Sequence, residues 1–314
     1  MKCYLTYFPS TQEFLSSGAL ITGEAFPGYL PYPEVAPNVK RLLGPTGPKI
    51  VVSVREPLSR AYSSYRYNYL RPALKALKKG KGPRHVFVPK DQPDEYYIQN
   101  FLFSFEELIS AELKNLKSCL VPGGDGEQRS KLKYPWAEDE YLYRDAFGLP
   151  QLVDVELCHF SRLSNKLPLP SMQFSELSAA NPSKVIDIPR GNHLIQSMIG
   201  RGLYALAMEW WYLSFSAEDI HVVCLEGLSK DTEEMDKLTS FLGLPKYDWG
   251  EVLSRGRYNM GGNEGYDTLT KIDNRQSPIP VEIPISKALR EEVQDFISVY
   301  NERLFKLIGH RCPW

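Results

Sequence analysis

The sequence has no apolar run of the roughly 18 residues that a membrane span requires, and no apolar signal-peptide core follows Met1. Its five cysteines and five histidines show none of the spacings typical of metal sites. A glycosylation sequon (Asn-x-Ser/Thr) is also absent, because Asn181 is followed by Pro182. We therefore expect no transmembrane segment and no metal in this chain, and these features leave its compartment open.

An excess of positive charge is absent too, since 37 lysines and arginines face 38 acidic residues and the net charge is −1. Such a chain has no general attraction for nucleic acid or for anionic membranes, so any polyanion has to bind at a local patch. What is present is a length of 314 residues with 43% hydrophobic and 12% aromatic content. These values predict an ordered globular protein with a substantial core, in one large domain or two.

The most informative stretch runs from Val51 to Tyr65. Its first four residues are apolar and mostly β-branched, which predicts a buried strand. Pro57 suits the first position of a following helix, whose apolar face is formed by Leu58, Ala61, Tyr62, Tyr65 and Tyr69. The other side of this helix carries Arg60, Ser63, Ser64 and Arg66. A buried strand thus leads to a helix start where Arg55, free backbone N–H groups and a serine can bind a phosphate.

The pattern Arg55-x-Pro57-x-x-Arg60-x-x-Ser63-x-Tyr65 resembles the 3′-phosphate-binding strand and helix of sulfotransferases that use PAPS (3′-phosphoadenosine 5′-phosphosulfate). It is most similar to that of the Golgi carbohydrate sulfotransferases, such as the heparan sulfate N- and 3-O-sulfotransferases and the chondroitin GalNAc-4-sulfate 6-O-sulfotransferase. The resemblance implies that Arg55 and Ser63 bind the 3′-phosphate and that Arg60 belongs to the same cofactor site. The residues alone leave the alternative that Arg60 and Ser63 are solvated side chains on an amphipathic helix.

An acidic residue follows an apolar segment near the start of the chain. Leu20–Thr22 is expected to be a short strand, and Glu24 lies just beyond it, where open α/β sheets bind their ligands. Carbohydrate sulfotransferases have a similar Glu-x-Ser-x-x-Tyr segment, here with Phe26 in place of the serine and Tyr29 in place of the tyrosine. The resemblance implies that Glu24 is the catalytic base and that Tyr29 contacts the substrate. A glutamate that caps a turn is the alternative.

The second region of resemblance begins near residue 190. Residues 197–211 predict a long helix, residues 220–225 a buried strand, and residues 234–242 an amphipathic helix that Gly243 ends. This order of elements, with the sequence Arg-Gly-Leu-Tyr-Ala at its start, also resembles the carbohydrate sulfotransferases. It implies that Arg201 and Tyr204 face the acceptor. Trp210 and Trp211 are expected in the core.

A late loop rich in glycine contains two arginines, Arg255 and Arg257, followed by Gly261 and Gly262. Backbone N–H groups at glycines and bidentate arginine side chains bind anions, and sulfotransferases cover the nucleotide with a basic loop of this kind. These four residues are therefore candidate cofactor ligands, with a plain surface loop as the alternative. A final helix is expected over residues 286–308, with its core side formed by Leu289, Val293, Phe296, Val299, Tyr300 and Leu304.

The middle of the chain has no match to the family. A basic run is either a solvated helix end or a docking rim for an anionic glycan, and it contains Lys75, Lys78, Lys79, Lys81, Arg84 and Lys90. A helix is expected over residues 103–120, with Phe105, Leu108, Leu113 and Leu116 near one face.

The Lys-x-Gly-Thr loop with which sulfotransferases hold the 5′-phosphosulfate is not found ahead of Glu24. We therefore expect an α/β fold of the sulfotransferase P-loop type that is N-terminally incomplete, with a mostly parallel sheet flanked by helices. It is expected to be a single domain over residues 1–314, with a core of about 15–70 and 190–308 and a variable insert of about 71–189.

The expected function is transfer of a sulfuryl group from PAPS, without a metal, to a carbohydrate hydroxyl on an acceptor such as a sulfated glycan. Nucleic acid is not an expected partner. Two alternatives stay open: a sulfotransferase for a small hydroxylated metabolite, and a non-catalytic binding protein that lacks the P-loop. The resemblance implies the Golgi lumen as the compartment, and the cytoplasm is the alternative.

Overall fold

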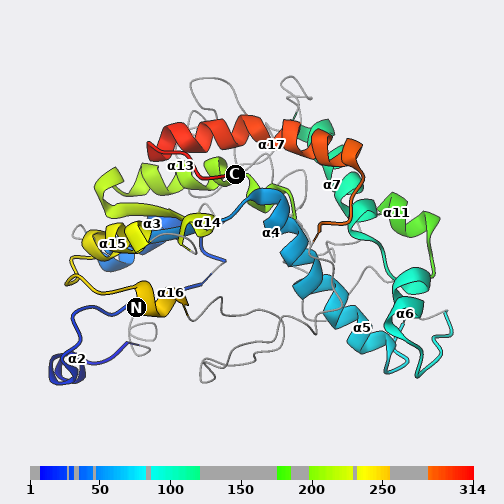
Figure 1. Ribbon diagram of the computed structural model, residues 1–314, viewed down its shortest axis with the longest axis horizontal. Coiled ribbons are helices and arrows are strands. Elements are labelled where there is room, and N and C mark those ends of the chain that lie inside the picture. Colours follow the sequence, from blue (N-terminus) through cyan, green and yellow to red (C-terminus); the bar gives the residue numbers. More distant parts are fainter. Residues whose placement is uncertain are drawn as a thin grey trace. The chain divides into compact units, whose positions relative to one another are not determined.

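The computed structural model describes residues 8–26, 28–31, 35–44, 47–82, 86–120, 175–184, 198–228, 232–254 and 282–314 (Figure 1). The chain divides into two compact units. The strand unit comprises Met1–Val54, Ala207–Ser277 and His310–Trp314. The helical unit comprises Arg55–Leu206 and Pro278–Gly309. The expectation of one domain over residues 1–314 stays a prediction.

The strand unit contains a parallel pair of strands, β1 (Ile50–Val54) and β2 (Ile220–Cys224). Ile50 lies opposite Ile220 and Val54 opposite Cys224, so the two carboxyl ends share one edge. Both strands are rich in β-branched residues, which favour the extended backbone and pack well on a pleated surface. The strands predicted from residue 51 and from residue 220 and their parallel direction are confirmed, and in the described part of the chain the sheet has these two strands. The expectation that the first of them is buried is wrong in part, because β1 is buried at Val52 and Val54 but Val51 is 43% exposed.

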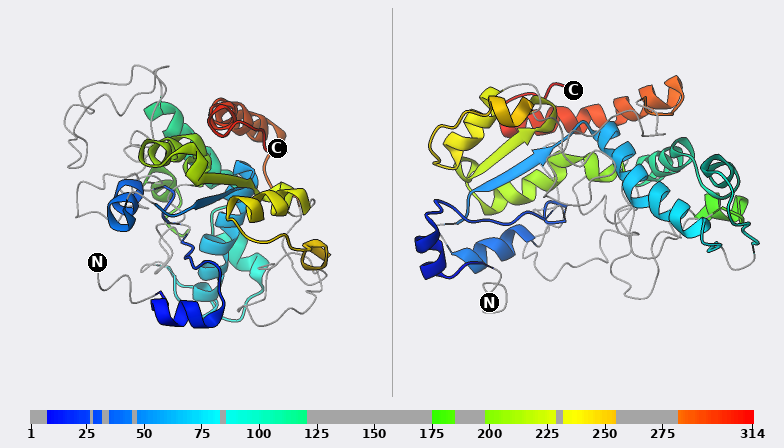
Figure 2. Two further views of the ribbon diagram at one scale, coloured as in Figure 1. Left: turned by 90° about the vertical axis from the view of Figure 1, so that its left-hand side faces the viewer. Right: turned by 60° about the horizontal axis from the view of Figure 1, so that its bottom comes forward.

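The strand unit also contains several helices. They are α2 (Thr11–Ser17), α3 (Val35–Leu43), α14 (Leu225–Leu228), α15 (Thr232–Phe241), α16 (Gly250–Ser254), the 3-10 turn η4 (Ala217–Asp219) and most of α13 (Tyr204–Ser214). Of these, α14 and α15 contact β2. α13 and α15 lie on opposite sides of the strands (Figure 2). Trp210 and Trp211 of α13 are buried, as expected. α15 ends before Gly243, whose φ of +68° suits glycine, again as expected.

The helical unit begins with one long helical run, formed by α4 (Pro57–Ser64), the π-helical turn η1 (Tyr65–Leu70) and α5 (Arg71–Leu77) (Figure 1). Pro72 explains the π-turn, because its ring would clash with the carbonyl of Asn68 in a regular α-helix and a wider turn relieves that clash. The predicted apolar face of this run is confirmed, since all five of its members are buried: Leu58, Ala61, Tyr62, Tyr65 and Tyr69.

Further helices complete this unit: α6 (Asp94–Phe101), α7 (Phe105–Leu120), α11 (Ser175–Ala180), the 3-10 turn η3 (Gly200–Gly202) and α17 (Lys287–Ile308). α17 packs against α4 and α7. Two buried tyrosines bind the backbone of Phe103, which lies two residues ahead of α7. The Tyr65 hydroxyl donates to the Phe103 carbonyl at 2.9 Å, and the Phe103 N–H donates to the Tyr69 hydroxyl at 2.9 Å. The predicted helices over residues 103–120 and 286–308 are confirmed.

Three expectations about the fold are wrong in part. Leu20–Thr22 is not a strand; Leu20 is 64% exposed, and the described sheet offers this segment no partner strand. The long helix expected from residue 197 begins only at Tyr204, because Gly200–Gly202 forms a tight 3-10 turn. Val299, placed on the core side of the last helix, is 50% exposed.

The described structure is thus a mixed α/β one with a small parallel sheet, as the sequence predicts at this level. The finer expectation of a P-loop-type fold stays a prediction. Among the residues described, no helix combines the length and the apolarity that crossing a bilayer would require.

Candidate functional site

The start of α4 is the first part of the candidate site. Arg55 follows the last residue of β1, and Glu56 caps the helix through its carboxylate, which accepts from the N–H of Leu58 at 3.0 Å and of Ser59 at 2.6 Å. Pro57, at the first helical position, has no N–H to satisfy. Two of the backbone donors expected to bind phosphate are therefore occupied by Glu56. An anion held here has to rely chiefly on side chains.

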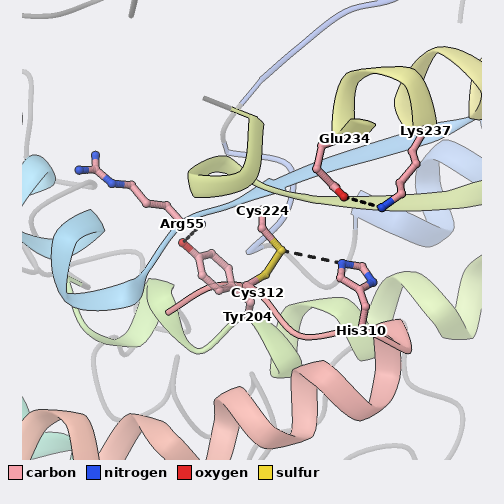
Figure 3. The surroundings of a disulfide bond; sticks show 7 residues. All are labelled: Arg55, Tyr204, Cys224, Glu234, Lys237, His310 and Cys312. Carbon is pink, nitrogen blue, oxygen red and sulfur yellow. Dashed lines mark hydrogen bonds and ion pairs between the residues drawn. A yellow bond between two sulfur atoms is a disulfide. The ribbon is translucent and has the colours of Figure 1, made fainter. Parts of the chain in front are cut away.

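Arg55 is anchored through its backbone. Its N–H donates to the hydroxyl of Tyr204 at 3.3 Å, while its guanidinium points away from the Tyr204 ring (Figure 3). Tyr204, which is predicted to contact the substrate, is buried, with 6% of its surface exposed. Its hydrogen bond to the Arg55 N–H holds the junction between β1 and α4 in place. The Arg55 side chain is half-buried.

Three arginines gather around this junction. Burial lowers the pKa of Arg60 most, and the positive charges of Arg201 and Arg55 lower it further, whereas the carboxylate of Glu112 acts in the opposite direction. Part of the Arg60 side chain stays at the surface, but its guanidinium is enclosed and donates to the carbonyl of Met198 at 2.7 Å. Arg55 and Arg201, two predicted site residues from separate segments, are therefore both electrostatic neighbours of Arg60.

The two serines of α4 differ in their surroundings. Ser63, the predicted phosphate ligand, is exposed. Ser64, expected on the same polar side, is buried instead and accepts a hydrogen bond from the side-chain amide of Asn68 at 3.1 Å. Arg66 lies over the ring of Tyr62, 5.8 Å from its centroid. Of the two serines, Ser63 is the one whose exposure suits ligand binding.

A buried glutamate in this region was missed by the sequence analysis. Glu112 in α7 is fully buried, and its carboxylate accepts from the N–H groups of Met198 at 3.0 Å, Ile199 at 2.9 Å and Gly200 at 3.1 Å. Burial raises the pKa of Glu112 to about 7, against the effect of these three hydrogen bonds and of Arg60. The segment that leads to Arg201 is thus held on a buried carboxylate.

The sequence did contain an indication of this role. Glu112 follows Leu108 by four residues and precedes Leu116 by four, so it lies on the buried face of α7. A charged residue in such a position is rarely left without partners.

Glu24 and Tyr29 both belong to the strand unit and are in contact there. Their roles as base and substrate residue stay predictions. The Tyr29 hydroxyl donates to the Glu24 carboxylate at 2.8 Å, and this hydrogen bond raises the pKa of Tyr29. Glu24 is exposed, and the ring of Phe26 meets that of Tyr29 edge to face with centroids 5.0 Å apart. The Trp211 indole donates to the Leu30 carbonyl at 3.4 Å and ties this segment to α13.

The remaining predicted ligands, Arg255, Arg257, Gly261 and Gly262, lie outside the described residues. In the basic run, Lys78 forms an ion pair with Asp94, which raises the pKa of Lys78. Across the parts of the chain that the structure describes, no cluster of His, Cys, Asp and Glu could hold a metal ion.

A disulfide joins Cys224, at the carboxyl end of β2, to Cys312 near the end of the chain (Figure 3). Both cysteines are 4% exposed, and the imidazole of His310 lies 3.8 Å from the Cys224 sulfur. The odd number of cysteines and the separation of 88 residues gave no indication of this pairing in the sequence.

No protein-family model matches the chain. A curated protein of Dictyostelium discoideum, named membrane-associated sulfotransferase kil1, is similar to it, with 21% identity over 312 residues. The match covers 94% of this chain and 53% of the relative, so the chain spans about half the length of that protein.

Proposed function

We propose that this chain is a PAPS-dependent sulfotransferase that transfers a sulfuryl group to a hydroxyl of a carbohydrate. The observation that carries the proposal is the junction between β1 and α4, where Arg55 follows a parallel strand with buried Val52 and Val54 and lies close to Arg60. Arg201 lies close to Arg60 as well. A group of arginines at a helix start suits a phosphate ester. The similarity to a protein named a sulfotransferase supports the same reaction class.

In this proposal the 3′-phosphate of the nucleotide is bound by Arg55 and by the exposed hydroxyl of Ser63. The loop that contains Arg255, Arg257, Gly261 and Gly262 covers the nucleotide. Arg201 contacts the acceptor, and Tyr204 fixes the backbone of Arg55. PAPS is consumed as a co-substrate. Its negatively charged phosphate is bound by arginine side chains that are already in position before PAPS binds.

Glu24 is the proposed base. As the acceptor oxygen forms its bond to sulfur, the bond from sulfur to the 5′-phosphate oxygen breaks, and the acceptor proton passes to the Glu24 carboxylate. The products are the sulfate ester and 3′-phosphoadenosine 5′-phosphate (PAP). The hydroxyl of Tyr29 orients the carboxylate through its 2.8 Å hydrogen bond.

The proposed compartment is the lumen of the secretory pathway, with the Golgi as the expected site of carbohydrate sulfation. Disulfides persist in oxidising compartments and are rare in the cytosol of most organisms. The buried bond between Cys224 and Cys312 supports a luminal location for this reason.

The test is transfer of labelled sulfuryl from PAPS to a panel of acceptors: chondroitin sulfate, desulfated heparan chains, a phenol and a steroid. We expect labelled glycan with the parent chain and at most a trace with Arg55→Ala. Label on the phenol or steroid alone would reassign the acceptor to a small metabolite. No transfer to any acceptor by the parent chain would overturn the proposed activity.

A further inference from the structure

Glu112 is the most deeply buried acidic group that the structure describes, and the proposed reaction makes no direct use of it. Moving a carboxylate out of water is unfavourable unless it is paired and hydrogen-bonded. Its partners are three consecutive backbone N–H groups, at Met198, Ile199 and Gly200, all within 3.1 Å. One side chain of α7 thus fixes the start of the segment 198–204.

The same segment is attached to α4 from the other direction. Arg60 of α4 donates to the carbonyl of Met198 at 2.7 Å. Gly202 approaches Pro57 so closely that a Cβ on the glycine would lie 2.7 Å from the proline Cβ. The segment is therefore held between the first turns of α4 and the buried carboxylate of α7.

Two proposed site residues depend on this attachment. Arg201 lies in the 3-10 turn itself, and Tyr204 begins the helix that follows and accepts from the N–H of Arg55. A continuous series of contacts thus leads from Glu112, through the segment 198–204, to Arg55.

The charges in this region explain why a carboxylate is needed there. Arg55 and Arg201 each repel Arg60, which raises the energy of the site when no anion is bound. Glu112 counters this repulsion, since its negative charge favours the charged form of Arg60. Being fully buried, it offsets the positive charge without competing for the ligand at the surface.

We propose that Glu112 is a positioning residue of the nucleotide site, which docks the segment 198–204 against α4 and so pre-arranges Arg55 for the 3′-phosphate. This inference rests on the proposed function, because the ligand is taken to be the nucleotide of PAPS. Pre-arrangement improves affinity by lowering the ordering cost that binding would otherwise carry.

The test measures PAP binding by calorimetry, well below the unfolding temperature, for the parent chain, Glu112→Gln and Leu116→Ala. Leu116 is the matched control, because it is fully buried one turn further along α7 and Leu116→Ala also destabilises the fold. We expect Glu112→Gln to weaken PAP binding about 10-fold, in line with the loss of a buried charged partner. Leu116→Ala should keep the parent affinity despite a lower Tm.

A second comparison separates positioning from mere stability. If Glu112 acts through Arg55, Glu112→Gln should weaken binding by less than about twofold in an Arg55→Ala background, because coupled residues are not additive. Fully additive losses would contradict the inference.

The possible failures are distinguishable. A parent chain that does not bind PAP would overturn the proposed function and this role with it. If Glu112→Gln binds PAP as tightly as the parent chain does, the inference alone is overturned. Should Glu112→Gln be too unstable for calorimetry, the shorter Glu112→Asp is compared with Leu116→Ala by amide exchange of residues 198–200. Faster exchange in Glu112→Asp alone supports the docking role, and equal exchange overturns it.

Discussion

The candidate residues of the two units, here called the binding half and the catalytic half of the proposal, are built in different ways. Around the start of α4, Arg55, Arg60 and Tyr204 are held by contacts between segments more than 130 residues apart in the chain. In the strand unit, Glu24 and Tyr29 are five residues apart and joined by one exposed hydrogen bond. The first arrangement suits tight binding of a fixed anion, and the second suits a base that has to meet varied acceptors.

The difference also shows in what surrounds each half. The segment 198–204 contacts the buried carboxylate of Glu112 and the ring of Pro57. Small changes in the size of its side chains should therefore disturb the packing of the core. At Gly23, beside Glu24, an added Cβ would meet nothing within 4 Å. Gly202 should therefore respond strongly to a change of shape, and Gly23 should not.

The largest expected effect tests the catalytic half. Glu24→Gln removes the base but keeps the size of the side chain, so kcat should fall about 10²- to 10⁴-fold while the Kd for PAP stays at the parent value. Glu13→Gln is the control, because Glu13 is an exposed carboxylate of the same unit that only caps α2. An unchanged kcat in Glu24→Gln would remove Glu24 from the mechanism.

The next effect concerns stability of the strand unit, which the disulfide closes covalently. Cys224→Ser should lower the free energy of unfolding by about 2–4 kcal/mol, because the bond no longer restricts the unfolded chain. Denaturant titration measures the loss, and reductant should give the same loss in the parent chain. The double variant Cys224→Ser/Cys312→Ser should be no less stable than the single one. If reductant leaves the free energy of unfolding of the parent chain unchanged, the stabilising role of the disulfide is contradicted.

A pair of glycine substitutions sharpens the comparison between the halves. Gly202→Ala places a methyl group against Pro57 and should cost about 1–3 kcal/mol of stability, with weaker PAP binding. Gly23→Ala, where space is open, should change stability by less than about 0.5 kcal/mol. Thermal unfolding measures both. Equal effects at the two positions would mean that the close contact with Pro57 has no energetic importance.

The smallest effect is a pH dependence. Because the pKa of Glu112 is raised to about 7 in the folded state, the native protein binds more protons than the unfolded one between about pH 4.5 and 7. The contribution of Glu112 to stability is therefore present at low pH and lost as the pH rises to 7, by up to about 1 kcal/mol per pH unit. Urea titrations at pH 5, 6 and 7 measure the free energy of unfolding. We expect this free energy to fall less steeply with pH in Glu112→Gln than in the parent chain. The same dependence of the free energy of unfolding on pH in both proteins would contradict the raised pKa of Glu112.

The sequence predicted the local parts of this structure well. Pro57 and the spacing of Leu58 to Tyr69 defined α4 and its buried face, because helix starts and apolar periodicity are encoded within a few residues. Glu24 and Tyr29 were singled out by their resemblance to a family motif, and the hydrogen bond between them was not predicted.

What the sequence could not predict depends on long-range packing. The partners of Glu112 are 86 to 88 residues away, and the disulfide partners are separated by 88. Local spacing carries no information about which distant segments meet. The expected strand at Leu20–Thr22 failed likewise, because a strand exists only where another strand pairs with it.

The central claim is that the start of α4 binds the 3′-phosphate of a nucleotide. Calorimetric titration of the parent chain and of Arg55→Ala, each with PAP and with AMP, tests it most directly, because AMP lacks only that phosphate. The account predicts that the parent binds PAP at least about 10-fold more tightly than AMP, as a charge-assisted contact should allow, and that Arg55→Ala binds both equally. Equal binding of PAP and AMP by the parent chain, or a preference for PAP that survives in Arg55→Ala, would contradict it.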